Sequence, residues 1–211
     1  MNLRNPIFLF GFSVLLGLLL LVQIGNAQLG ISLWINQYHN VVFDFLCLNG
    51  TYLGDGWLIV ITSLLLYYFN PRLALAILLA YAISAGFTQL LKLFVFSGKH
   101  RPMWFLEQMQ QVQYYFVDGA EKNYNNSFPS GHTTSAFAVF SIIALLYPKN
   151  IIQVLCLFLA VFTAFTRIYL LQHFLIDTCV GATIGVLGAY FVFYILLEKG
   201  NLDFILKIHR K

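Results

Sequence analysis

Residues 151–197 decide the fold and read IIQVLCLFLAVFTAFTRIYLLQHFLIDTCVGATIGVLGAYFVFYILL. Arg167 and Asp177 are the only charged residues in this stretch, and both lie near its middle. The apolar run on either side is long enough for a membrane-spanning helix, which needs roughly 20 residues. The stretch therefore predicts two spans, over 151–171 and 174–197, joined by a short polar turn.

The rest of the chain has a similar composition. Of its 211 residues, 60% are hydrophobic and 9% are charged, which argues against a soluble domain. We expect an all-α integral membrane bundle of six transmembrane helices, over 7–24, 54–69, 73–96, 131–147, 151–171 and 174–197. A chain of this size has room for one membrane-embedded domain, covering 1–211. The net charge of +4 does not indicate nucleic-acid binding, because the cations are dispersed along the chain.

The positions of the cations predict the orientation of the bundle. With six spans both termini lie on one side, and that side carries Arg4, Arg72, Lys149, Lys199, Lys207, Arg210 and Lys211. The other side carries fewer cations and most of the acidic residues; its cations are Lys99, Arg101, Lys122 and Arg167. The positive-inside rule therefore places both termini in the cytoplasm. Short loops without a large soluble domain favour a bacterial inner membrane.

The first span has two interpretations. Arg4, an apolar core and the small residues Gly25-Asn26-Ala27 resemble a secretory signal peptide with its cleavage site. The apolar stretch is longer than the core of most signal peptides, so we favour a retained membrane anchor. The cysteines Cys47, Cys156 and Cys179 lie in or near apolar segments, where packing is their expected role.

An amphipathic segment follows the first span. Apolar residues recur at three- and four-residue steps from Ile31 to Phe45, and polar residues fill the other face. This pattern predicts a helix lying at the outer surface of the membrane. Such a helix either packs at the interface or lines an entrance for lipid.

Three short polar clusters interrupt the apolar sequence near the ends of expected spans: Lys92 with Arg101-Pro102, Pro129-Ser130-Gly131-His132, and Arg167 with His173 and Asp177. Charges at such places are costly unless they have a partner or a function. The expected topology places all three clusters on the outer face. Three cations, two imidazoles and one carboxylate suit an oxyanion of phosphorus.

The second cluster marks the start of the span at 131–147. Ser130 is a typical N-cap, and the first turn of a helix presents free N–H groups that favour a phosphate. Gly131 would let the backbone approach that anion closely, and His132 could reach it from the first turn. The alternative is an ordinary helix cap followed by an unrelated histidine.

The other two clusters add a carboxylate–imidazole pair and cations. His173 and Asp177 are four residues apart, so on a helix they share a face, and the carboxylate would fix the imidazole tautomer. The free ring nitrogen could then act as a nucleophile or base, although a purely structural ion pair has the same pattern. Lys92 and Arg101 could bind phosphate oxygens, or could simply extend their charges to the membrane surface.

In order and content these clusters resemble the signature of the type 2 phosphatidic acid phosphatase superfamily, in its bacterial membrane branch of lipid phosphate phosphatases. That signature is Lys-x6-Arg-Pro, then Pro-Ser-Gly-His, then Ser-Arg-x5-His-x3-Asp. Residues 129–132 match it in full, and the third cluster matches in spacing, with Thr166 in place of the usual serine.

The first cluster departs from the signature. Eight residues rather than six separate Lys92 from Arg101. We expect a bulge at the Ser97-Gly98 turn to absorb the two extra residues, with Lys92 still reaching the phosphate. Lys99 is a reserve phosphate ligand in this interpretation, and His100 is a solvated loop residue.

The resemblance implies a role for each matched position. His173 would attack phosphorus and form a phosphohistidine, Asp177 would orient it, and His132 would protonate the leaving oxygen and then activate water. The phosphate oxygens would be bound by Lys92, Arg101, Ser130, Gly131 and Arg167. No metal or other cofactor is expected, because cations and helix N-termini supply the positive field.

The sequence thus predicts a phosphatase acting on a membrane lipid mono- or diphosphate at the outer face. Undecaprenyl diphosphate, phosphatidylglycerol phosphate, phosphatidic acid and lipid A phosphates all fit this site. A phosphotransferase using the same phosphohistidine is the first alternative, and a transporter or channel is a remote one. The expected partners are the lipid substrate and the membrane, with no obligate protein partner.

Overall fold

The computed structural model describes residues 6–109 and 112–194, and within these ranges all regular structure is helical. The all-α prediction is therefore confirmed for the part of the chain described. The elements are α1 (Pro6–Gly25), α2 (Gln28–Asn36), α3 (Val41–Gly50), the 3₁₀ turn η1 (Thr51–Gly54), α4 (Gly56–Phe69), α5 (Pro71–Leu90), the π-helix η2 (Leu91–Val95), α6 (Pro102–Gln108), α7 (Gly131–Leu146), α8 (Asn150–Tyr169) and α9 (Leu175–Phe191).

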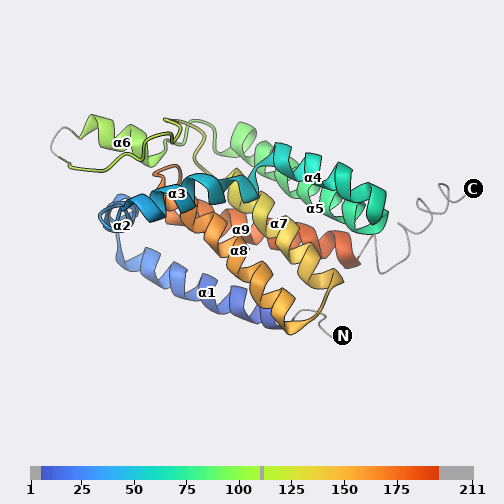
Figure 1. Ribbon diagram of the computed structural model, residues 1–211. Helices are drawn as coiled ribbons and strands as arrows, with labels where there is room; N and C mark the ends of the chain where they lie inside the picture. The colour runs from blue at the N-terminus through green and yellow to red at the C-terminus, as the bar shows by residue number, and fades with distance from the viewer. Residues whose placement is uncertain (1–5, 110–111, 195–211) are drawn as a thin grey trace, which may run out of the picture.

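The long helices run lengthwise beside one another, and α7 lies among them (Figure 1). It packs against α9, α8 and α5. The short helices α2 and α6 gather at one end of the bundle, opposite the end at which α1 begins. This arrangement surrounds α7 with other helices, and 10 of its 16 residues are buried.

Two glycines bring α9 against α7. A Cβ atom on Gly181 would lie 2.6 Å from the carbonyl oxygen of Ser130, and one on Gly185 would collide with the carbonyl oxygen of Thr134. Small residues four apart allow two membrane helices to approach to backbone contact. The contact continues to the end of the bundle, where the N–H of Ser130 donates to the carbonyl oxygen of Asp177 at 3.0 Å.

Helix α1 is joined to the bundle through a buried amide on α8. The side-chain oxygen Oε1 of Gln153 accepts from the backbone N–H groups of Ile7 at 3.1 Å and Phe8 at 3.2 Å. Phe8 and Phe12 are buried in the same core cluster as residues of α7, α8 and α9. This docking suits a retained anchor, and retention of the first span stays a prediction.

The segment expected as one amphipathic helix is two helices. Helix α2 ends at Asn36 and α3 begins at Val41. The side chain of Asn40 caps α3 by accepting from the N–H groups of Val42 and Phe43, both at 3.1 Å. An N-cap residue has extended backbone angles, so a helix cannot run through it, and the continuous helix predicted over 31–45 is wrong. Its place at a membrane surface stays a prediction.

By length and composition, four described helical stretches can cross a membrane: Pro6–Gly25, Pro71–Val95, Asn150–Tyr169 and Leu175–Tyr194. The pair Val41–Gly54 and Gly56–Phe69, bent by 61°, would make a fifth. The expected set of six is not confirmed. The span predicted at 54–69 corresponds to α4, with 14 residues, and the one at 131–147 to α7, with 16.

Part of the topology prediction falls on residues that the structure does not describe. These include the last residues of the span expected at 174–197 and the cations Arg4, Lys199, Lys207, Arg210 and Lys211. All three cysteines lie within the described ranges and are buried, as packing residues would be.

Candidate active site

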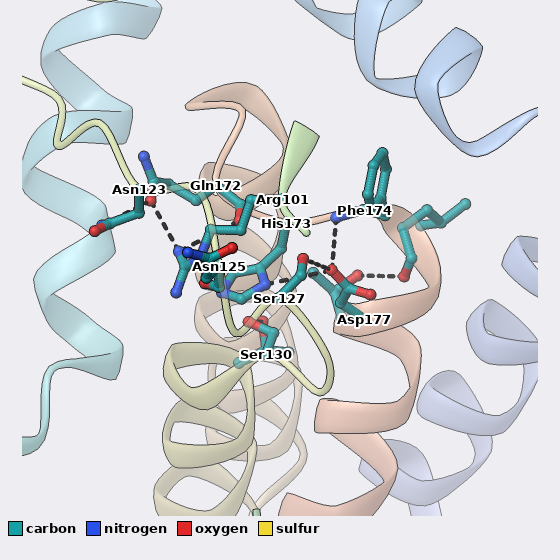
Figure 2. A network of polar contacts seen from close by, with 12 residues as sticks. Arg101, Asn123, Asn125, Ser127, Ser130, Gln172, His173, Phe174 and Asp177 are labelled. Atoms are coloured by element: carbon teal, nitrogen blue, oxygen red, sulfur yellow. Dashed lines mark hydrogen bonds and ion pairs between the residues drawn. The ribbon is translucent and has the colours of Figure 1, made fainter. Parts of the chain in front are cut away.

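The three polar clusters meet at the end of the bundle where α5 finishes and α7 and α9 begin. Lys92, Arg167, His173 and Asp177 are buried there, with exposed fractions of 8%, 6%, 1% and 2%. Figure 2 shows Arg101, His173, Ser130 and Asp177 close together, although they come from different parts of the chain. Because these buried side chains come from different parts of the chain, the packing of distant segments against one another holds them together.

His173 and Asp177 form the centre of this group. The Nδ1 atom of His173 lies 3.4 Å from Oδ2 of Asp177. The same oxygen accepts from the hydroxyl of Ser127 at 2.5 Å and from the N–H of Phe174 at 3.0 Å. A hydrogen on Nδ1 directed at the carboxylate leaves the lone pair of Nε2 free. This assignment of the tautomer follows from the hydrogen-bond partner.

The backbone of the turn before α9 fixes the position of the imidazole. The N–H groups of Gln172 and His173 both donate to the carbonyl oxygen of Arg167, at 2.9 and 3.1 Å. Leu171 has a positive φ of 56°, in the left-handed region. The chain therefore turns sharply after Arg167, and the third cluster is brought together by this turn as well as by helix spacing.

Burial lowers the pKa of His173 well below its ordinary value of 6.5, and the nearby charges of Arg101, Arg167 and Lys92 lower it further. Burial removes the water that would solvate an imidazolium, and the cations repel it. Although Asp177 lies beside the ring, we expect a neutral imidazole at neutral pH. A neutral imidazole has the lone pair that a nucleophile needs.

The second cluster begins α7, with one departure from expectation. Ser130 stands at the N-cap position, but its hydroxyl does not cap the helix; it lies 2.9 Å from the hydroxyl of Thr133. The N–H groups in the first turn therefore have no side-chain cap and can bind an anion. His132 follows Gly131, and its carbonyl oxygen is so close to Gly54 of η1 that a Cβ there would collide with it.

Lys92 lies in the π-helix η2, where the N–H of Phe96 donates to the carbonyl oxygen of Leu91 at 2.8 Å. Its Nζ atom is 4.0 Å from the point where a Cβ on Gly131 would stand. The expected turn at Ser97-Gly98 is present, with φ of 79° at Gly98. A π-helix adds a residue to a helical turn, so η2 and the Ser97-Gly98 turn are two places where the longer spacing could be absorbed, and this absorption stays a prediction.

The two arginines are held by residues outside the three clusters. Arg101 donates from Nη1 to Oε1 of Gln172 at 3.0 Å and from Nε to the carbonyl oxygen of Asn125 at 2.8 Å. Arg167 donates from Nη1 to the hydroxyl of Thr51 at 2.5 Å. Its Nε is buried, and no described residue accepts a hydrogen bond from it. A buried charged donor without an acceptor is costly, which favours an anionic ligand here.

Sequence reasoning missed the supporting residues. Ser127, Gln172 and Thr51 contact site residues, but only Gln172 stands beside one in the sequence. No local pattern distinguishes them from other polar residues in the loops. His100, expected to be a solvated loop residue, is only partly exposed: its ring stacks on Trp104 with centroids 4.1 Å apart, and its Nδ1 lies 2.9 Å from Oδ1 of Asn125. Lys99 is exposed, as expected.

Comparison with known proteins decides the family. The sequence model of the PAP2 superfamily matches residues 73–201, which include all three clusters. The chain belongs to the PAP2 superfamily. This confirms the family that the motifs resemble.

Individual PAP2 relatives agree with this result. The chain is 34% identical over 91 residues to the bacitracin transport permease protein BcrC of Bacillus licheniformis, a match that covers 43% of this chain and 44% of that protein, so the aligned region is less than half of the relative.

Two solved structures show the same fold. Aquifex aeolicus LpxE has a TM-score of 0.63 at 24% identity, covering 77% of this chain and 92% of its own. A PAP2-type phosphatidylglycerolphosphate phosphatase from Bacillus subtilis has a TM-score of 0.59 at 22% identity, covering 88% and 92%.

The lowered pKa of His173 gives a direct prediction. In the folded protein His173 should stay neutral at pH 6, which ¹⁵N NMR of its ring nitrogens can measure, with His173→Gln used to assign the signals. A doubly protonated ring at pH 6 would contradict it. Because the unfolded chain binds this proton more readily, the contribution of His173 to stability is present above about pH 6.5 and decreases as the pH falls below it.

Proposed function

We propose that this PAP2 protein is a metal-independent phosphatase that removes phosphate from a membrane lipid mono- or diphosphate through a phosphohistidine. The buried guanidinium of Arg167 carries this proposal, because its Nε has no acceptor among the described residues. Undecaprenyl diphosphate, phosphatidylglycerol phosphate, phosphatidic acid and lipid A phosphates are the candidate substrates. Of the relatives, the Bacillus subtilis protein is named as a phosphatidylglycerolphosphate phosphatase.

The balance of charge at the site supports an anionic ligand. Lys92, Arg101 and Arg167 come together near two carboxylates, Asp177 beside Lys92 and Arg101 and Glu121 nearer the two arginines, and the three positive charges repel one another. Removing charges from water costs several kcal/mol each unless partners replace the water. A phosphate with two negative charges would supply them, and its oxygens could accept from the free arginine donors.

The first chemical step follows from the geometry of His173. Its Nε2 lone pair attacks phosphorus, and a P–N bond forms as the P–O bond to the lipid breaks. His132, protonated once the doubly negative phosphate lies beside it, gives a proton to the departing lipid oxygen. The result is an enzyme-bound phosphohistidine, a lipid with a free hydroxyl or one phosphate fewer, and a neutral His132.

The second step restores the enzyme. His132 takes a proton from water, and the hydroxide attacks phosphorus as the P–N bond breaks. Inorganic phosphate leaves, His173 regains its lone pair, and His132 is protonated again. Water thus supplies the oxygen of the product, and each histidine ends in the state in which it began.

Charge develops in both steps where the site can stabilise it. Phosphorylation at Nε2 gives the imidazole of His173 a positive charge, which Asp177 stabilises through Nδ1. The equatorial phosphate oxygens face Lys92, Arg101 and Arg167, together with Ser130 and the N–H groups at Gly131. These donors stand in place before the reaction, so no metal ion is needed to neutralise the phosphate.

We further propose six spans, with the site on the outer face of a bacterial inner membrane. Helix α4 would form the second span, and α3, bent by 61° from it, would lie at the outer surface. Helix α7 would form the fourth, since other helices surround it and its short apolar length meets little lipid. The termini would then lie in the cytoplasm, as the cation distribution predicts.

Replacing His173 tests the proposal. Purified protein should release inorganic phosphate from a panel of the four lipid classes, and His173→Ala should lose at least about a thousandfold of this activity. His39→Ala, which removes an exposed histidine that stacks on Tyr115, serves as the matched control and should remain active. Activity should also persist in excess EDTA.

Three outcomes would contradict parts of the proposal. Substantial activity in His173→Ala would exclude this residue as the nucleophile. Loss of activity in EDTA, restored by a divalent cation, would exclude metal-independent chemistry. If the substrate carries a labelled phosphate, transfer of that phosphate to an added lipid alcohol or sugar instead of water would identify a phosphotransferase.

The first motif allows a second test, with matched lysines. Lys92→Met should lower kcat/KM by about a hundredfold, because a buried cation facing the phosphate would be lost. Lys99→Met removes an exposed lysine from the same motif and should have little effect. Steady-state kinetics on the best lipid of the panel would measure both. A larger loss of kcat/KM in Lys99→Met than in Lys92→Met would show that Lys99, and not Lys92, contacts the phosphate.

A further inference from the structure

Gln172 is a buried amide, 2% exposed, between Arg167 and the proposed nucleophile His173. We propose that it is a positioning residue that orients Arg101 toward the phosphate, an inference that rests on the proposed function. Its Oε1 accepts from Nη1 of Arg101 at 3.0 Å, and its Nε2 donates to the carbonyl oxygen of Glu121 at 2.5 Å. Figure 2 shows Gln172 and Arg101 side by side.

The donors of Arg101 are divided between protein and ligand. Nη1 is directed at Gln172, whose backbone oxygen also lies 3.4 Å away, and Nε is directed at the carbonyl oxygen of Asn125. Nη2 has no acceptor in the described part of the chain, and it is the nitrogen left for a phosphate oxygen. A guanidinium is planar, so fixing two of its nitrogens fixes the direction of the third.

Gln172 also fixes the distance between Arg101 and the nucleophile. Its backbone N–H donates to the carbonyl oxygen of Arg167 at 2.9 Å, and the next residue is His173. The same short turn thus carries the nucleophile and the group that holds Arg101. Catalytic groups must be held within a fraction of an ångström to be effective, and this link supplies such control.

The amide is better suited to this task than other side chains. One end must accept from a guanidinium, and the other must donate to a backbone carbonyl, and both ends are enclosed. Asn123 donates to the same Oε1 at 3.3 Å and makes no hydrogen bond to Arg101 within the described ranges. A substitution of Asn123 therefore tests the packing of the loop around Gln172 without removing an acceptor of Arg101.

A double-mutant cycle tests the inference. Gln172→Met preserves the length of the side chain and removes both hydrogen-bonding ends, and it should lower kcat about tenfold or more with a smaller change in KM. In an Arg101→Ala background the same change should alter kcat by less than about twofold, because nothing remains to be oriented. Asn123→Ala is the matched control and should keep kcat near that of the wild type.

A second variant covers the case in which Gln172→Met does not fold. Gln172→Glu keeps an acceptor for Nη1 of Arg101 and loses the donor to the carbonyl oxygen of Glu121. Its kcat should exceed that of Gln172→Met. If Gln172→Met does not fold, the kcat of Gln172→Glu should still be several-fold higher than that of Arg101→Ala. Thermal unfolding in detergent would be measured for every variant, to separate folded from unfolded protein.

The outcomes separate this inference from the function on which it rests. No phosphate release by the wild type would overturn the proposed function. With an active wild type and an inactive His173→Ala, equal effects of Gln172→Met with and without Arg101 would overturn the positioning role alone. A Gln172→Glu variant no better than Arg101→Ala would also overturn it.

Discussion

Backbone contact between α7 and α9 brings the chemical groups of the site together. Gly181 and Gly185 leave no side chain between the helices, and the carbonyl oxygens of α7 lie where a Cβ would stand. Both helices begin at the same end of the bundle, and the Ser130–Asp177 backbone hydrogen bond ties their first residues. The first turn of α7, which has no side-chain cap, and the imidazole–carboxylate pair before and within α9 are therefore adjacent. Any side chain at these glycines would separate them.

The second constraint is the burial of charge. Lys92 and Arg167 are each less than a tenth exposed, and Arg101 is held among protein acceptors. Charges at this depth are stable when partners replace water, yet the buried Nε of Arg167 has no acceptor among the described residues. The fold thus maintains a positive field that the protein alone does not neutralise. That field is useful for a reaction in which negative charge on phosphate oxygens must be stabilised.

The sequence was sufficient for the family, the helical class and the residues of the three clusters, because those features are local in spacing or apolar length. The sequence was less informative where two local preferences compete for the same backbone, or where a contact joins distant positions. Asn40 divided the expected amphipathic helix, since its cap bonds outweigh the continuing apolar pattern. Helices α4 and α7, with 14 and 16 residues, are too short to count alone as candidate spans, so the six expected spans are not confirmed. Thr51 and Ser127 could not be found, because their contacts with Arg167 and Asp177 join positions 116 and 50 residues apart.

The central claim is a covalent phosphate on His173. The most direct measurement is rapid-quench labelling with a ³²P-lipid phosphate from the active panel, stopped in alkali within one turnover and mapped by peptide mass spectrometry. Phosphohistidine survives alkali and is lost in acid, so the account predicts acid-labile label on the peptide that contains His173, and none in His173→Ala. Label on another residue, or rapid phosphate release from the wild type with no labelled protein at any time within the first turnover, would contradict it.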